Sequence, residues 1–395
     1  MPVKQTPLSL PDRLRGWRDR LIADPRFQSW SLGNPLTRWI ARRSSRAMLD
    51  LCAGFVYSQV LFACVQLRLF ELLKDGPLTI SDLAAKTALS EDAARRLLDA
   101  ASSLGLAQRR GEGRYGLGRL GAALLGSPEA LALIEHQPML YADLRDPVAL
   151  LRGGEETALA RYWPYSAAER PSALSAGEVG PYSALMAASQ PMVAREALAV
   201  YKIEKHRRLL DVGGGEGVFL AEAAARAPAL ELELFELPAV AERARMRLEA
   251  AGLAGRARIF GGDFLKDPLP QGADVISLVR IVHDHDDASA LALLRNARRA
   301  LPLGGTLLII EAVSGEKGVE PLDAYYGFYT LAMGRGEPRT FEEIGALYAR
   351  EGQEKTISGL TGFWALIPFV GWIIWVLKTQ GHLNRYWESH GALAA

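Results

Sequence analysis

The second half of the chain alternates short apolar runs with amphipathic or alanine-rich stretches. Short apolar runs are typical of strands buried in a parallel sheet, and the longer stretches between them are typical of the helices that cover it. The pattern therefore predicts a doubly wound α/β domain. The expected strands are 209–212, 232–237, 257–260, 273–282 and 305–311, with helices over 218–225, 290–301 and 325–333.

The first half is mostly helical in its pattern. Capping Thr and Ser residues precede two amphipathic stretches, and a Gly111-Glu112-Gly113 turn divides a short β-like segment. An earlier, almost continuous apolar stretch contains enough polar positions to favour a buried interface helix over a membrane span. The expected helices are 55–73, 79–89 and 90–104, followed by a hairpin over 107–117.

Helix, turn, helix and hairpin predict a winged helix, a fold often used to bind DNA. The second helix offers only Arg95 and Arg96 as cations, and three acids lie beside them. Binding to the phosphate backbone needs a surplus of positive charge, so this helix is poorly suited to a DNA groove. The formal net charge of the whole chain, +1, also argues against a nucleic-acid partner.

These patterns divide the chain into five parts. We expect a basic aromatic arm at 1–46, the winged helix at 47–118, a helical region at 119–200, the α/β domain at 201–352 and a hydrophobic tail at 353–395. The helical region carries aromatic and methionine side chains that are suited to an apolar substrate slot. They are Met139, Tyr141, Trp163, Tyr165, Tyr182, Met186 and Met192.

Both ends of the chain are rich in tryptophan. The arm interleaves nine arginines with Trp17, Trp30 and Trp39, which is typical of a segment lying on an anionic membrane or of a helical arm packed on a partner subunit. The sequence leaves these two interpretations open. In the tail, residues 360–377 carry no charge, and Pro368 and Gly371 in their middle favour interfacial or hairpin insertion over a straight span. Packing over the sheet edge, or a segment joined by frameshift or fusion, are the alternatives.

Composition adds little chemistry. Cys52 and Cys64 are the only cysteines and lie in an apolar segment, so neither a disulfide framework nor a cysteine-based metal site is expected. The first apolar stretch is interrupted by charges, which is unlike a signal peptide. We therefore expect a cytoplasmic protein that meets cytosolic cofactors, peripheral to the inner membrane if its ends bind lipid.

A glycine cluster follows the first strand of the α/β domain, at the turn where such a sheet binds a nucleotide. Asp211, Gly213 and Gly215 belong to this turn, and Glu236 ends the next strand about twenty residues on, where a carboxylate binds ribose hydroxyls. Asp263 and Phe264 follow the third strand and are placed to hold an adenine ring. No Gly-Lys-Ser/Thr follows the glycines, which argues against a triphosphate site. A dinucleotide and S-adenosylmethionine both fit these residues.

The fourth strand decides between them. His283 follows it at the carboxyl edge of the sheet, and Glu311 follows the fifth strand at the same edge, so the two side chains can hydrogen-bond. Methyl transfer to a hydroxyl needs a base that removes the hydroxyl proton, and histidine is suited to this near neutrality. A carboxylate beside it favours the productive tautomer.

The ordered motifs resemble those of the cation-independent, S-adenosylmethionine-dependent O-methyltransferases, over roughly residues 50 to 350. They are residues 211–215, Glu236-Leu237-Pro238, Gly262-Asp263-Phe264, Arg280-Ile281-Val282-His283-Asp284 and Glu311. The resemblance implies a Rossmann-like class I methyltransferase domain after a winged-helix dimerisation domain, a homodimer, and no metal. It also implies His283 as general base, Glu311 as the carboxylate that orients it, and Gly213, Glu236, Asp263 and Phe264 as cofactor contacts. Arg280 is a weaker cofactor contact, because the basic residue of the family can stand one position earlier, and the role of Glu337 stays open.

Within this family, residues 55–60, 140–147 and 162–165 resemble the branch from purple photosynthetic bacteria that methylates carotenoids. That branch methylates the tertiary 1-hydroxyl of hydroxyneurosporene and demethylspheroidene. The alternatives are a phenolic or polyketide acceptor and, in another class, a winged-helix, ligand-sensing regulator with an inactive methyltransferase fold.

Overall fold

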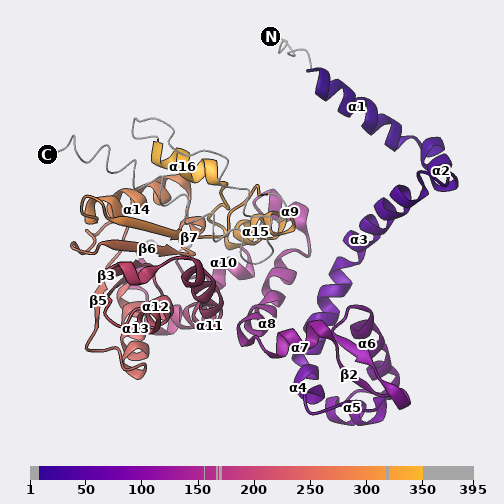
Figure 1. Ribbon diagram of the computed structural model, residues 1–395, viewed down its shortest axis with the longest axis horizontal. Helices are drawn as coiled ribbons and strands as arrows, with labels where there is room; N and C mark the ends of the chain where they lie inside the picture. Colours follow the sequence, from indigo (N-terminus) through magenta and orange to yellow (C-terminus); the bar gives the residue numbers. More distant parts are fainter. Residues whose placement is uncertain (1–8, 155, 166–167, 169–170, 317–319, 350–395) are drawn as a thin grey trace. The chain divides into compact units, whose positions relative to one another are not determined.

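The computed structural model describes residues 9–154, 156–165, 168, 171–316 and 320–349 (Figure 1). The expected hydrophobic tail, 353–395, lies outside these residues. The chain forms two compact units, Met1–Leu125 and Gly126–Ala395. The expected boundary after residue 118 thus lies a few residues later, because the helix that follows the hairpin still packs on the first unit.

The first unit contains the predicted winged helix. Thr79 caps one of its helices through a reciprocal capping box with Asp82, and Ser90 caps the next, which confirms both predicted starts. Ala107 pairs with Leu117 across the predicted antiparallel hairpin. The elements of this unit are α1 (Leu10–Ala23), α2 (Pro25–Gly33), α3 (Arg38–Gln66), α4 (Leu69–Leu73), α5 (Ile80–Thr87), α6 (Glu91–Ser103), β1 (Ala107–Arg109), β2 (Tyr115–Leu117) and α7 (Arg119–Leu125).

The apolar helix expected over 55–73 is wrong in its bounds. Helix α3 begins at Arg38, inside the expected arm, and ends at Gln66, because Arg68 adopts a left-handed conformation with φ of 52° and starts α4. Most of α3 is exposed within the single chain. Among the described residues, α3 alone has the length and composition of a membrane-crossing helix, and 11% of its apolar window is buried.

The second unit begins with helices and continues into a parallel sheet. Its elements are α8 (Pro128–Asp143), α9 (Pro147–Leu151), α10 (Ala158–Tyr162), α11 (Ala176–Val200), β3 (Arg208–Val212), α12 (Val218–Arg226), β4 (Glu231–Glu236), α13 (Pro238–Ala250), β5 (Ala257–Gly261), β6 (Val275–Val279), α14 (Asp287–Ala300), β7 (Thr306–Ile310), α15 (Glu320–Met333) and α16 (Phe341–Ala349). The strands run in the order β5-β4-β3-β6-β7, and all their pairings are parallel. The predicted α/β class is confirmed.

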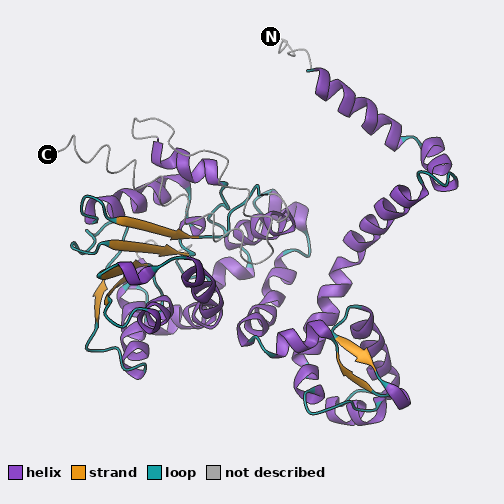
Figure 2. Ribbon diagram, in the orientation of Figure 1, coloured by secondary structure: helices purple, strands orange, loops and turns teal. Residues whose placement is uncertain are grey.

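Helices cover both faces of this sheet, as Figure 2 shows. One core cluster joins the sheet to Ala194 of α11, Phe219 of α12 and Leu248 of α13. The other joins it to Leu293 of α14 and Ile344 of α16. Burial on both faces explains why the central strands are apolar throughout. It also leaves the carboxyl ends of the strands as the edge where polar side chains gather, and the strand order reverses between β3 and β6 at this edge.

Candidate active site

The loop after β3 requires glycine for its backbone and for space. Gly213, Gly215 and Gly217 have φ of 67°, 56° and 78°, a left-handed conformation that other residues rarely adopt. A Cβ on Gly213 would lie 2.8 Å from Cδ1 of Ile281, and one on Gly214 would lie 2.2 Å from a carboxylate oxygen of Asp211. The loop therefore packs too closely on neighbouring side chains to accept a Cβ at Gly213 or Gly214.

Glu236 lies at the end of β4, beside the glycine loop. Its carboxylate accepts hydrogen bonds from the backbone N–H of Gly215 at 3.0 Å and of Leu237 at 2.7 Å. Burial raises the pKa of Glu236 to about 7, and these two bonds oppose the shift. Each carboxylate oxygen of Glu236 keeps a further lone pair, so the two oxygens can accept hydrogen bonds from a pair of ribose hydroxyls. Those bonds would stabilise the negative charge of this buried carboxylate.

Asp211 does not take the position expected of a cofactor contact. Its side chain is fully buried, and its Oδ1 accepts a hydrogen bond from the hydroxyl of Ser277 on β6 at 2.6 Å. Its Oδ2 has no hydrogen-bond partner among the described residues, and burial raises the pKa of Asp211 to about 7. The carboxylate lies beneath Gly214, because a strand directs alternate side chains to opposite faces. Asp211 supports the loop from below and does not line the cavity.

A cleft lies in front of these strand ends and encloses about 1020 Å³ of empty space, its open mouth included. Six of the predicted cofactor residues line it: Gly213, Gly215, Glu236, Asp263, Phe264 and Arg280. From the helical region it takes four of the predicted apolar side chains: Trp163, Tyr165, Tyr182 and Met186. The cleft thus has a polar floor made by the sheet and an aromatic wall made by α11 and the segment before it.

The fourth strand ends earlier than predicted. Strand β6 stops at Val279, because Arg280 turns the chain with φ of 55°. Its guanidinium is held by the hydroxyl of Ser189 at 2.8 Å and the amide oxygen of Gln190 at 3.3 Å, both on α11. The next residues form a short 3₁₀ turn, Val282–Asp284, which carries His283.

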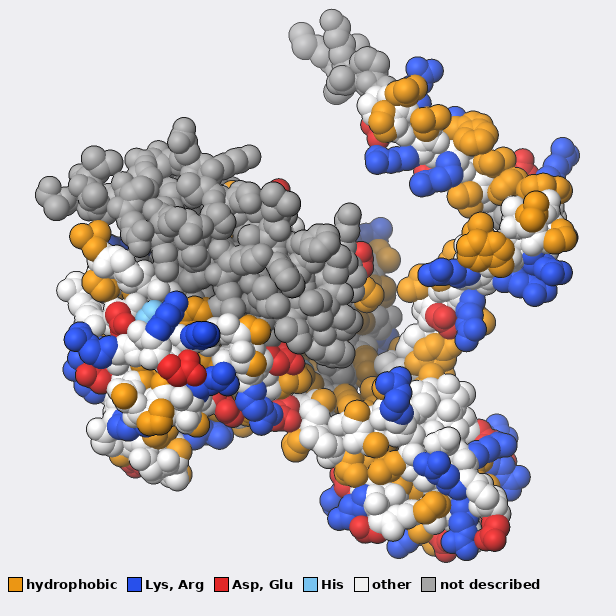
Figure 3. Space-filling view, in the orientation of Figure 1, with side chains coloured by type: hydrophobic (Ala, Val, Ile, Leu, Met, Phe, Trp, Pro, Cys, Tyr) orange, Lys and Arg blue, Asp and Glu red, His pale blue; other side chains and the backbone are white. Residues whose placement is uncertain are grey.

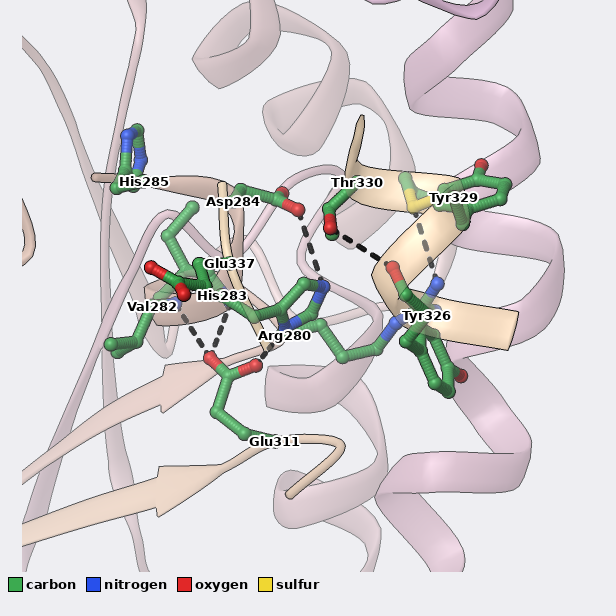
Figure 4. A network of polar contacts seen from close by, with 12 residues as sticks. Arg280, Val282, His283, Asp284, His285, Glu311, Tyr326, Tyr329, Thr330 and Glu337 are labelled. Carbon is green, nitrogen blue, oxygen red and sulfur yellow. Dashed lines mark hydrogen bonds and ion pairs between the residues drawn. The ribbon is translucent and has the colours of Figure 1, made fainter. Parts of the chain in front are cut away.

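Glu311 organises this turn (Figure 4). One carboxylate oxygen accepts the backbone N–H of Ile281 at 2.7 Å and of Val282 at 2.6 Å, and the other contacts Nδ1 of His283. The predicted meeting of His283 and Glu311 is thus present in the structure. Asp284 lies on the other side of the ring, with its carboxylate 3.2 Å from Nε2.

The carboxylates set the protonation of His283. Burial alone would lower the pKa of its imidazole, but the charges of Glu311 and Asp284 outweigh burial and raise it to about 9. Burial likewise raises the pKa of Asp284 to about 6, against the pull of the imidazolium. Because Nδ1 donates to Glu311, the neutral ring presents Nε2 as a proton acceptor, and the two carboxylates stabilise the cation that forms.

Sequence reasoning missed two members of this arrangement. Asp284 stands next to the histidine in the motif, and that adjacency is the signal that could have identified it. Arg339 is 4% exposed and donates to the carbonyl oxygens of Val282 at 2.9 Å and His285 at 2.7 Å. The backbone N–H of Glu337 donates to the carbonyl of His283 at 2.9 Å. No spacing in the sequence links Arg339 or Glu337 to the histidine turn.

Comparison with known proteins agrees with this geometry. Residues 141–354 match the family model of the O-methyltransferase domain, and residues 49–127 match that of the O-methyltransferase dimerisation domain. The chain belongs to the O-methyltransferase family. This O-methyltransferase uses S-adenosylmethionine, and the glycine loop and Glu236 provide the backbone and carboxylate that such a cofactor needs. The match also assigns the winged helix to a dimerisation domain.

Among curated relatives, the demethylspheroidene O-methyltransferase of Cereibacter sphaeroides is 44% identical over 89% of this chain and 92% of its own. The enzyme of the same name from Rhodobacter capsulatus is 40% identical over 86% of this chain and 84% of its own. Among the solved structures with a TM-score of 0.65 are CalO1 of calicheamicin biosynthesis with SAH, 30% identical, and human N-acetylserotonin methyltransferase with SAM, 26% identical. They cover 78% and 79% of this chain, respectively, and each match covers 92% of the solved chain.

Replacing Gly213 tests the cofactor loop. In Gly213→Ala the new Cβ strains a left-handed backbone and overlaps Ile281, so we expect S-adenosylmethionine binding to weaken by roughly tenfold or more. Isothermal titration calorimetry measures this. The matched control is Gly255→Ala, where a Cβ has no neighbour within 4 Å. Equal affinities of the two variants would contradict the role given to the loop.

Replacing Glu311 tests the electrostatics of the turn. Methyl transfer in the wild type should rise with pH as His283 loses its proton, with a midpoint at about 9. Glu311→Gln removes the charge that raises this pKa, so the midpoint should move to lower pH. An amide also disfavours the productive tautomer, so the plateau rate should fall by roughly 10²-fold or more. Initial rates across the neutral and alkaline range report both. Glu342→Gln, an exposed change on α16, should leave the profile unaltered.

Proposed function

We propose that this chain transfers the methyl group of S-adenosylmethionine to the tertiary 1-hydroxyl of an acyclic carotenoid, such as hydroxyneurosporene or demethylspheroidene. The observation that carries the proposal is the 44% and 40% identity, over most of the chain, to two enzymes named demethylspheroidene O-methyltransferase. The reaction belongs to the biosynthesis of spheroidene and spirilloxanthin.

The side chains of the turn supply the proton transfer that this reaction needs. S-adenosylmethionine provides an electrophilic methyl group, whereas a tertiary alcohol is a weak and crowded nucleophile until its proton is removed. In our proposal Nε2 of His283 accepts that proton. Glu311 holds the proton on Nδ1, and Glu311 and Asp284 together balance the charge of the imidazolium.

The wall of the cleft is suited to an apolar acceptor. Trp163, Tyr182 and Met186 line it, and Trp163 is only 3% exposed in its packing against the neighbouring rings. Aromatic and methionine side chains exclude water and adapt to a long apolar molecule. A phenolic or polyketide acceptor would meet the same base, and a catechol control distinguishes it from a carotenoid.

We also propose that the enzyme acts as a homodimer in the cytoplasm. The dimerisation-domain match begins at residue 49, within α3. Leu51, Phe55 and Val56 of this helix are largely exposed in the single chain, and a second copy would remove them from water. S-adenosylmethionine is a cytosolic cofactor, which favours this location.

The test is transfer of a labelled methyl group from S-adenosylmethionine to hydroxyneurosporene or demethylspheroidene in detergent, with catechol as the control acceptor. We expect label in the carotenoid and none in catechol. His283→Ala should reduce transfer by roughly 10²–10⁴-fold while cofactor binding is retained, since a general base contributes about this much. Label in catechol alone, or full transfer by His283→Ala, would contradict the proposal.

A further inference from the structure

The first helices of the chain expose an apolar surface that the family domains do not include. Helices α1, α2 and the start of α3 precede residue 49, where the dimerisation-domain match begins. Trp17, Trp30 and Trp39 are each more than half exposed. A soluble surface rarely presents three exposed tryptophans in so short a segment, so this arm, residues 10–46, must be covered in use.

The apolar, basic and acidic residues of helix α1 lie on different faces of the helix. Since each residue of a helix advances by about 100°, Leu10, Leu14, Trp17 and Leu21 fall within about 60° of one another. Arg18 and Arg20 flank this stripe on either side, and Asp12 and Asp19 lie opposite to it. Long arginine side chains beside an apolar stripe reach the headgroups while the stripe enters the acyl boundary, and the acids remain in water. This is the arrangement of a helix that lies in a membrane interface.

Charge identifies the kind of surface that the arm fits. Residues 1–46 hold nine arginines and Lys4 against three aspartates, a net charge of +7, whereas the whole chain has +1. The remaining residues therefore carry −6. Over the described residues 9–46, Asp12 pairs with Arg15 and Asp19 pairs with Arg18, which leaves most of the arginines to face solvent. Figure 3 shows basic and hydrophobic side chains along α1 and α2.

Helix α3 continues the same pattern. Arg38, Arg42 and Arg46 follow at intervals of four residues and share one face with Trp39 and Arg43 close by. The apolar part of α3 begins directly after this basic turn. The arm therefore presents arginines next to apolar side chains in two separate helices, α1 and α3. Two independent occurrences of this pattern argue against coincidence.

We propose that residues 10–46 are a docking surface for an anionic lipid bilayer. Helix α1 lies along the bilayer with its leucines and Trp17 inserted, and the arginines contact lipid phosphates. Binding to the bilayer depends on the side chains of the arm alone. Its use, to bring the cleft to an acceptor dissolved in lipid, rests on the carotenoid proposed above.

The experiment uses the full chain with three exposed arginines of the arm replaced: Arg13→Gln, Arg20→Gln and Arg42→Gln. A matched control makes the same charge change elsewhere, with Arg95→Gln, Arg145→Gln and Arg152→Gln, which are also exposed. Each protein is sedimented with vesicles of phosphatidylcholine alone and of phosphatidylcholine mixed with phosphatidylglycerol, at low and high salt. Binding of SAH checks that each protein is folded.

We expect the wild type and the control to bind the phosphatidylglycerol vesicles and to be released by salt. The arm variant should bind them roughly tenfold or more weakly, because each arginine contributes to attraction at an anionic surface. A Trp17→Ser variant should bind more weakly at both salt concentrations, since it loses inserted apolar area.

Three results would overturn the inference. They are no binding by the wild type, equal binding by the arm variant and the control, and a change of the arm variant from dimer to monomer in analytical ultracentrifugation. The last result would assign the arm to a second copy of the chain. Vesicle binding is measured without carotenoid, so the inference and the proposed acceptor can fail separately. An arm variant that still methylates carotenoid in detergent would uphold the acceptor whatever the vesicles show.

Discussion

The carboxylate of Glu311 is the contact on which the geometry of the site depends. It follows β7, and β7 lies beside β6 in register, with Ile310 opposite Val279. The side chain after Ile310 therefore reaches the residues after Val279. There it accepts two backbone N–H groups and contacts the imidazole of His283. Without it two buried donors would lose their partners, at about 1–3 kcal/mol each.

This single contact joins the fold to the chemistry. The backbone N–H groups of Ile281 and Val282, which follow β6, need a hydrogen-bond acceptor, and so does Nδ1 of the imidazole. The carboxylate of Glu311 accepts from all three. On the other side of the turn, Arg339 holds the carbonyl oxygens of Val282 and His285, so donors and acceptors of the turn are both satisfied. A turn fixed from two sides keeps Nε2 of His283 in one position, beside Asp284, which lines the cleft. General base catalysis requires such a fixed position.

The α/β fold and most residues of the site could be predicted from the sequence, and the physical reason differs from residue to residue. Gly213 follows β3 and Glu236 ends β4, so local pattern and spacing are enough to predict both positions. The pairing of His283 with Glu311 needed one further step, the rule that parallel strands end at the same edge. The inward position of Asp211, the turn at Arg280 and the contacts of Arg339 depend on packing between distant segments, which a single sequence does not display. The end of α3 likewise depends on the left-handed turn at Arg68, which the apolar pattern does not reveal.

The most direct test of this account is the titration of His283 itself. The six histidines of the chain can be followed by ¹⁵N-edited NMR of histidine-labelled protein, and the signal of His283 is assigned as the one that disappears in His283→Gln. The account predicts a pKa of about 9 and a proton on Nδ1 in the neutral form. A pKa at or below the ordinary value of about 6.5, or a proton on Nε2 in the neutral ring, would contradict it.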